Sequence, residues 1–256
     1  MFDDFFKCWD ELPADGGFKL FGIVHIGWLI VIAAAICLLV YYFRKLPDEV
    51  KIKRLRLLSV ITLGLEILKD IFLIAKGKMA FSYLPLEMCG LAIFIELFYA
   101  FTGKKFFGEI MCIICMPGAF AALLFPDWTG YPLLNFIHIN SFILHGMLVA
   151  VPVIAVFSGM YMPKIRNIYK VYLFLIITVP VIYLINKWQG TNFMFLNHPS
   201  NGSPFYGIYE KWGYTTYMII YALVVIVCIF IMYAIYGVLA KYKTQPPENP
   251  CTSKTL

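Results

Sequence analysis

The sequence LLNFIHINSFILHGMLVAVPVIAVFS fills residues 133–158 and contains no Asp, Glu, Lys or Arg. Its few polar side chains are histidine, asparagine and serine. A helix rises about 1.5 Å per residue, so about 20 apolar residues suffice to cross a hydrocarbon core of about 30 Å. Residues 133–158 therefore predict a membrane-spanning helix.

Windows of the same kind recur along the whole chain. Hydrophobic residues make up 61% of it and its mean hydropathy is +0.79, whereas soluble domains are only about half apolar. The windows long enough to span a bilayer are 19–43, 54–76, 82–103, 106–126, 133–158, 168–187 and 214–240. Their short connections leave no room for a soluble domain. The sequence thus predicts an all-α fold, a single bundle of seven transmembrane helices over residues 1–243 with a disordered cytoplasmic tail at 244–256.

Basic residues predict the orientation of this bundle. Of the 21 Lys and Arg residues, fourteen fall on one set of alternate connections and six on the other, with Lys69 inside a window. Since positive charge favours the cytoplasmic side, we expect the N-terminus outside and the C-terminus in the cytoplasm. The acidic first 15 residues do not resemble a cleavable signal peptide. The formal net charge of +6 then reflects topology rather than nucleic-acid binding, and the expected location is a bacterial-type cell membrane.

The cysteines do not predict a disulfide framework. There are seven, an odd number without repeated spacing. Cys112 and Cys115 form a CxxC pair inside the window 106–126, where packing is the favoured role because no further soft metal ligands lie at the same depth. The sequence also lacks a Gly-rich phosphate loop and an HExxH motif. We therefore predict no metal and no cofactor.

Ionisable residues within the windows gather toward one side of the predicted bundle. Counting about 1.5 Å per residue from the outer end of each window places them in the outer half of the bilayer or near its centre. They are His25, Glu66, Lys69, Asp70, Glu87, Cys89, His138 and His145. Ionisable groups in lipid are costly and tend to mark function. Their convergence predicts a single polar site that opens outward.

Helical spacing selects a candidate reactive pair within this set. His138, Ser141 and His145 share one face of their window, with Asn135 one turn outward. A thiol is nucleophilic as the thiolate, and an adjacent imidazole is its usual activator. Cys89 and His145 are therefore the predicted nucleophile and base.

Three other features each fit two roles. Glu66 and Asp70 are four residues apart with Lys69 beside both, which fits a salt bridge within the bundle or a catalytic role. His25, alone on an apolar helix, is favoured as a hydrogen-bonded core histidine over a catalyst. The aromatic connection 188–213 fits an interfacial belt or a lid over the site.

Motifs in six of the windows resemble one known family. They are FGIVH at 21–25, GLEILK at 64–69, LPLEMC at 84–89, PGA at 117–119 with FPD at 125–127, FILHG at 142–146, and YLINK at 183–187 with GTN at 190–192. In this order the chain resembles the YwaF-like family of integral membrane proteins, which includes transmembrane protein 164, over nearly its full length. The resemblance implies an acyltransferase that acts on membrane phospholipids.

The resemblance also implies residue roles. Cys89 matches the acyl-accepting cysteine and His145 its partner histidine. A fatty acyl group would pass from a donor phospholipid to Cys89 as a thioester, and then to the hydroxyl of a lysophospholipid. One position departs from the pattern, because the residue two before the cysteine is often His in the family and is Glu87 here. Residues expected to support the site or position the substrate are His25, Glu66, Lys69, Asp70, Glu87, Asn135, His138, Asn186 and Asn192.

Other functions remain compatible with the sequence. A proton-coupled transporter or channel would use the acids and lysine at 66–70 with the histidines as a relay. It predicts polar residues continuing through the inner half, where Glu96 and Glu109 are the main acids. A membrane lipid hydrolase would use water as the acyl acceptor, and a non-catalytic lipid-binding protein would leave Cys89 as a packing residue. The partners expected for the transferase are phospholipid and lysophospholipid.

Overall fold

The computed structural model describes residues 4–13, 16–200 and 203–244, which form helices and connecting loops without a strand. The α-helices are α1 (Ile23–Arg44), α2 (Asp48–Ala75), α3 (Met88–Thr102), α4 (Lys105–Ile110), α5 (Met116–Leu124), α6 (Phe136–Phe157), α7 (Ile168–Gln189) and α8 (Tyr206–Thr244). Short helices are η1 (Trp9–Glu11), η2 (Phe81–Tyr83), the π-helical η3 (Met111–Cys115), η4 (Ile165–Asn167) and η5 (Phe193–Phe195). The all-α prediction is confirmed for these residues.

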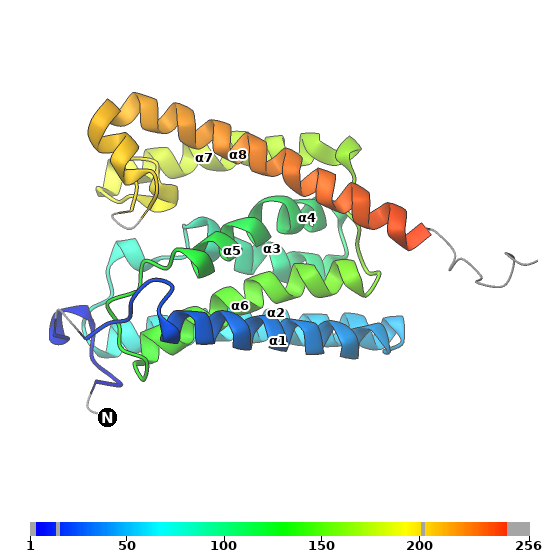
Figure 1. Ribbon diagram of the computed structural model, residues 1–256, viewed down its shortest axis with the longest axis horizontal. Helices are drawn as coiled ribbons and strands as arrows, with labels where there is room; N and C mark the ends of the chain where they lie inside the picture. Colours follow the sequence, from blue (N-terminus) through cyan, green and yellow to red (C-terminus); the bar gives the residue numbers. More distant parts are fainter. Residues whose placement is uncertain (1–3, 14–15, 201–202, 245–256) are drawn as a thin grey trace, which may run out of the picture.

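Helix α6 lies at the centre of the bundle. It packs against α1, α2 and α5, and α2 packs against α3 (Figure 1). Helices α7 and α8 occupy the side opposite to α1 and α2, with α3, α4 and α5 between them. In the most apolar window of each helix, 67% of residues are buried in α6 and 6% in α1. The rest of the protein therefore leaves most of the apolar surface of α1 uncovered, and this surface requires an apolar surrounding such as lipid.

A helix occupies each of the seven predicted windows, but not all of these helices have the length and composition of a membrane span. Among the described residues, five stretches do: Ile23–Arg44, Lys105–Leu124, Phe136–Phe157, Ile165–Gln189 and Tyr206–Tyr242. Helix α3 has 15 residues and is shorter. Helix α2 is long, but it carries four basic residues within 48–56 and three more charged residues, Glu66, Lys69 and Asp70, in its second half. A count of seven spans and the orientation of the termini therefore stay predictions.

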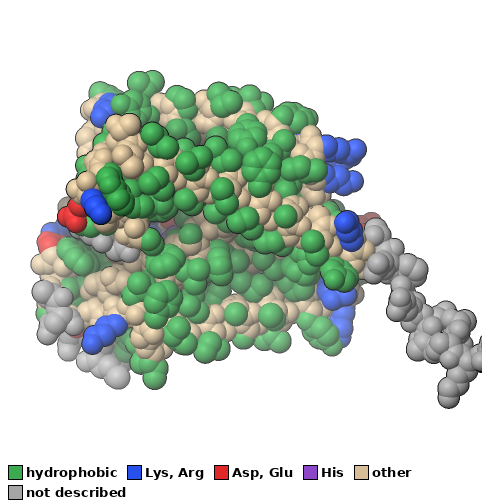
Figure 2. Space-filling view, turned by 45° about the horizontal axis from the view of Figure 1, so that its top comes forward, with side chains coloured by type: hydrophobic (Ala, Val, Ile, Leu, Met, Phe, Trp, Pro, Cys, Tyr) green, Lys and Arg blue, Asp and Glu red, His purple; other side chains and the backbone are tan. Residues whose placement is uncertain are grey.

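The molecular surface is that of a membrane-embedded protein. Hydrophobic side chains cover the face shown in Figure 2, and Lys and Arg gather at its two ends. Large apolar side chains such as Ile23, Leu38 and Ile176 are more than half exposed. The predicted tail at 244–256 begins at the last residue of α8, and residues 245–256 lie outside the described residues.

Candidate functional site

Cys89 is the second residue of α3, because a tight turn delays the start of this helix. The Leu86 N–H donates to the carbonyl of Leu84 at 2.7 Å across Pro85, and Glu87 is extended. The sequence window began at residue 82, six residues too early, since Pro85 excludes a helical residue before it. At Gly90, a Cβ atom would lie 2.5 Å from the Pro85 carbonyl carbon, so only glycine fits this approach.

The first turn of α3 presents unpaired backbone donors around the thiol. The first helical hydrogen bond runs from the Leu91 N–H to the Glu87 carbonyl at 2.9 Å. Within the described part of the chain, the N–H groups of Met88, Cys89 and Gly90 have no acceptor. Unpaired N–H groups and the helix dipole make such an end favourable for negative charge.

His145 has one ring nitrogen engaged and the other available. Its Nδ1 donates to the carbonyl of Ser141 at 2.8 Å, because a carbonyl oxygen only accepts. In the neutral ring this leaves a lone pair on Nε2, which has no hydrogen-bond partner among the described residues. The ring stacks on Trp128 with centroids 4.7 Å apart and an angle of 23°. His145 therefore has the tautomer and the support of a general base.

Asp127 connects the predicted pair electrostatically. The charge of its carboxylate acts on Cys89, Glu87 and His145 through space rather than through a hydrogen bond, although Asp127 lies on the loop after α5. Glu66 also interacts with Cys89. The structure thus brings α2, α3, α6 and the α5–α6 loop to one polar cluster. Our choice of site residues omitted Asp127, because it lies outside the apolar windows; its signal was the FPD motif at 125–127.

The acidic pair of α2 surrounds its lysine. Lys69 Nζ lies 2.6 Å from Glu66 Oε1 and 3.5 Å from Asp70 Oδ1. Glu66 is buried, and Lys69 and Asp70 are partly buried. These distances are those of the salt bridge within the bundle that the sequence allowed. The charge of Lys69 also acts on His145 through space.

His25 and His138 are buried and engaged through both ring nitrogens. His25 Nε2 donates to the carbonyl of Leu123 at 2.8 Å, and its Nδ1 accepts from the Phe21 N–H at 2.9 Å. His138 Nε2 accepts from Trp28 Nε1 at 2.8 Å, while its Nδ1 donates to a loop carbonyl at 3.0 Å. Each ring therefore joins two segments of chain and has no nitrogen left for a substrate.

Three predicted asparagines hold loops in place. Asn135 caps α6 by accepting from the Ile137 N–H at 2.8 Å. Asn186 accepts from the Phe193 N–H at 2.8 Å and donates to the Phe193 carbonyl at 2.9 Å. Asn192 accepts from the Asn197 N–H at 2.9 Å. The structure gives these three residues a role in anchoring loops, and Asn186 holds the segment whose Met194 N–H bonds to Glu87.

Glu87 links the start of α3 to the connection after α7. Its Oε2 accepts from the Met194 N–H at 2.6 Å. Met194 and Phe195 adopt positive φ of 56° and 53°, and Tyr217 donates to the Phe195 carbonyl at 2.6 Å. Residues 193, 194 and 196 are buried against Leu84, Leu86 and Met88, while Trp188 stays exposed. The middle of this connection thus covers the α3 turn, as the lid alternative requires.

The CxxC pair lies in the π-helix η3. Cys112 and Cys115 are fully buried and not disulfide-bonded. Within the described ranges, no group of three or more His, Cys, Asp or Glu side chains could hold a metal ion.

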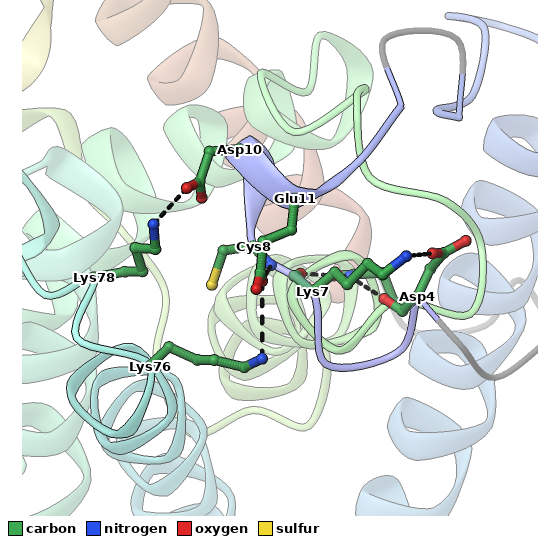
Figure 3. Close-up of polar contacts among 8 residues, drawn as sticks. Asp4, Lys7, Cys8, Asp10, Glu11, Lys76 and Lys78 are labelled. Atoms are coloured by element: carbon green, nitrogen blue, oxygen red, sulfur yellow. Dashed lines mark hydrogen bonds and ion pairs between the residues drawn. The ribbon is translucent and has the colours of Figure 1, made fainter.

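Residues 4–13 form an N-terminal strap across the loop after α2 and the loop before α6 (Figure 3). Asp10 pairs with Lys78, Glu11 lies 3.8 Å from Lys76, and Asn135 donates to the carbonyls of Asp4 and Lys7 at 2.8 and 2.9 Å. The Lys78 hydrogen bond lowers the pKa of Asp10, and the same contact raises the pKa of Lys78. Burial raises the pKa of the Cys8 thiol.

The strap also packs closely against the loop that carries Asp127. At Gly130 a Cβ atom would lie 1.8 Å from the Trp9 ring, so glycine is required there. After the strap, the Phe18 N–H also donates to the Thr129 carbonyl of this loop at 2.8 Å. The strap therefore holds the α5–α6 loop beside the polar cluster.

Comparison with known proteins identifies the family of this chain. The model of the TMEM164 family matches residues 20–233, which include every residue of the charged cluster. No curated protein matches the chain, and no solved structure matches it.

Proposed function

Because the chain belongs to the TMEM164 family, we propose that this membrane protein is a phospholipid acyltransferase that works through a Cys89 thioester. It would move a fatty acyl group from a phospholipid to a lysophospholipid. The observation that carries the proposal is the position of Cys89 beside unpaired N–H groups at the start of α3. Asp127 interacts electrostatically with both Cys89 and His145.

The first half-reaction forms the thioester. His145 Nε2 takes the thiol proton, and the Cys89 sulfur attacks the ester carbonyl carbon of the donor lipid. The carbonyl oxygen becomes an oxyanion, which the N–H groups of Met88, Cys89 and Gly90 stabilise. The carbon–oxygen bond then breaks, and the departing lysophospholipid oxygen takes the proton from His145.

The second half-reaction runs in the opposite direction. The hydroxyl of an acceptor lysophospholipid gives its proton to His145 Nε2 and attacks the thioester carbon. The carbon–sulfur bond breaks, and the sulfur regains the proton. The negative charge of Asp127 favours the protonated imidazole that exists between these steps. Water in place of the lysophospholipid would give a hydrolase by the same route.

Glu87 has a positioning role in this scheme. A carboxylate near the thiol opposes formation of the thiolate, so it is a poor activator where the family often has histidine. Its bond to the Met194 N–H instead holds the buried connection over the α3 turn. The Glu66–Lys69–Asp70 group and the three asparagines similarly support the site.

The proposal includes the arrangement in the membrane. With α2 and α3 counted as spans, seven helices place the N-terminus outside and the C-terminus in the cytoplasm of a bacterial-type cell membrane. The cluster then lies near the outer ends of the helices, at a depth that lipid esters reach.

The test uses purified protein with a radiolabelled donor phospholipid and an unlabelled lysophospholipid. We expect Cys89→Ala to lower transfer at least about 10³-fold, and intact-mass analysis to show an acyl adduct only when Cys89 is present. Cys37→Ala is the matched control, because Cys37 is an exposed thiol on α1. Transfer that survives Cys89→Ala would disprove the thioester mechanism, and release of free fatty acid instead of transfer would assign a hydrolase.

A proton-coupled transporter is the second candidate. It is favoured by one acidic residue, Glu96, in the inner half of the proposed bundle. Glu96 is fully buried, and neither carboxylate oxygen has a hydrogen-bond partner among the described residues. It interacts electrostatically with Cys89 and Cys112. Proton flux into liposomes that is lost with Glu96→Gln and kept with Cys89→Ala would select this function.

A further inference from the structure

Trp128 carries a buried donor without an acceptor. The residue is 7% exposed, and within the described part of the chain its Nε1 has no hydrogen-bond partner. An indole N–H only donates. Buried donors are nearly always paired in native proteins, because an unpaired one loses its bond to water without replacement. A buried indole N–H without a protein partner is therefore a donor that a bound molecule can engage.

The position of Trp128 identifies where this acceptor would be. Its ring stacks on the imidazole of His145, and it follows Asp127, which interacts electrostatically with Cys89. Binding sites typically combine an apolar lining with a few polar groups that orient the ligand. The donor thus belongs to a ring that lies against the histidine proposed as the base.

Trp28 provides the internal comparison. It also packs against Phe142, with parallel rings 5.1 Å apart, whereas Trp128 meets the same ring edge-on at 5.3 Å. The Nε1 of Trp28, however, donates to His138 at 2.8 Å. The two indoles share one aromatic cluster and differ in whether the protein itself supplies the acceptor.

We propose that Trp128 Nε1 donates a hydrogen bond to an acceptor oxygen of a glycerolipid, either the ester carbonyl or a phosphate oxygen. This binding contact rests on the proposed function, since it assigns the lipid to the same site. The indole fixes the lipid beside His145, and the stacked ring keeps the imidazole in place. In this proposal Trp128 binds the substrate, Cys89 stays the nucleophile and His145 stays the base.

The first test measures stability without lipid. Trp128→Phe and Trp28→Phe both keep an aromatic ring and lose the same part of the indole, so lost packing lowers the thermal midpoint in maltoside detergent in each. Trp28→Phe also removes a partnered donor and leaves His138 Nε2 buried without one, so we expect its midpoint to fall several degrees further than that of Trp128→Phe. An equal fall in both variants overturns the proposal, because it shows that the Trp128 N–H is already satisfied, for example by the face of Phe142.

The second test measures lipid binding with two probes that separate the acceptor oxygens. Monoacylglycerol has an ester carbonyl and no phosphate, and an alkylphosphocholine has a phosphate and no ester. We expect Trp128→Phe to weaken binding of at least one probe about 5- to 10-fold, as the loss of one hydrogen bond does. Weakening confined to monoacylglycerol assigns the carbonyl, and weakening confined to alkylphosphocholine assigns the phosphate.

The controls keep this inference separate from the proposed function. Trp188→Phe alters an exposed tryptophan and should leave both affinities unchanged. Unchanged affinity for both probes in Trp128→Phe overturns the inference, whatever Cys89→Ala does to transfer. Binding is also measured with Trp128→Phe added to the Cys89→Ala protein, in which the proposed thioester cannot form. Weaker binding of a probe in that background supports the contact, even if transfer survives Cys89→Ala and the thioester mechanism fails.

Discussion

At the residue scale, the histidines divide by the number of ring nitrogens that the protein itself engages. His25 has both engaged, with Phe21 and Leu123, and joins the start of α1 to the end of α5. His145 has only Nδ1 engaged. The first arrangement is typical of a structural histidine and the second of a base.

This division predicts opposite effects of replacement. His25→Phe leaves a backbone donor and a carbonyl without their partner, so we expect the free energy of unfolding to fall by about 2–4 kcal/mol. Transfer per folded molecule should change little. His145→Asn should keep the thermal midpoint within a few degrees and lower kcat at least about 10²-fold. Loss of kcat in folded His25→Phe protein would contradict the structural assignment of His25.

The sequence suggested a reactive pair more readily than the residues that support it. Cys89 and His145 could be chosen from the sequence because both lie in apolar windows and match motifs of the family, and their reactive role stays a prediction. Asp127 could not, since a carboxylate on a loop has no helical period to place it beside them. His138 and Asn135 were grouped with His145 by spacing, but shared helix faces do not reveal that Trp28 and the strap engage them.

At the element scale, the start of α3 controls the site. The approach of Pro85 to Gly90 sets the register in which Cys89 becomes the second helical residue. A side chain at position 90 would push the turn away and move the thiol relative to His145.

Gly90→Ala therefore predicts a combined loss. Overpacking should lower the free energy of unfolding by about 1–3 kcal/mol, and transfer should fall with it because the unpaired N–H groups move. Gly64→Ala is the matched control: a Cβ there meets open space in α2, and removing a helical glycine stabilises by about 0.5–1 kcal/mol. Chemical denaturation measures the free energy of unfolding of both variants. Full transfer in Gly90→Ala would show that the register of α3 does not matter for catalysis.

Hydropathy located the helices but not their interruptions. Apolar windows place a helix wherever backbone groups must be satisfied internally, which is why each predicted window holds one. The π-helix at 111–115 and the turn at 84–87 depend on local packing rather than on hydropathy, so the windows 82–103 and 106–126 passed through them.

At the scale of the whole molecule, the N-terminal strap connects segments that are distant in sequence. Its ion pairs reach the residues after α2, and its backbone reaches the cap of α6. Between these contacts, Trp9 of the strap packs against Gly130 in the loop that carries Asp127 and Trp128.

The Asp10–Lys78 contact predicts a pH window for this connection. The pKa of Asp10 is lowered from 3.8, so the contact stabilises the fold above that pH and is lost as the pH falls through the lowered value. The pKa of Lys78 is raised from 10.5, so the contact is complete below that pH and is lost in stronger alkali. We expect wild type to exceed Asp10→Asn in thermal midpoint at pH 7, and the difference to shrink at about pH 3.

Salt provides an independent measurement. Exposed charge pairs are screened at 1 M salt, where the Debye length is about 3 Å, so labelling of the buried Cys8 by a maleimide at pH 7 should accelerate with salt. A small soluble thiol is the reference for the reagent itself, because the exposed Cys228 lies within the apolar helix α8. Equal salt dependence at both thiols would mean that ion pairs do not hold the strap.

The strap also imposes an order of events during synthesis. The Asp4 carbonyl is bonded to Asn135, a partner 131 residues further along the chain. At about 5–20 residues per second, a ribosome needs on the order of 10 s to deliver that partner after the strap has emerged. The strap thus leaves the ribosome well before Asn135 and cannot dock on the cap of α6 until that residue has been made.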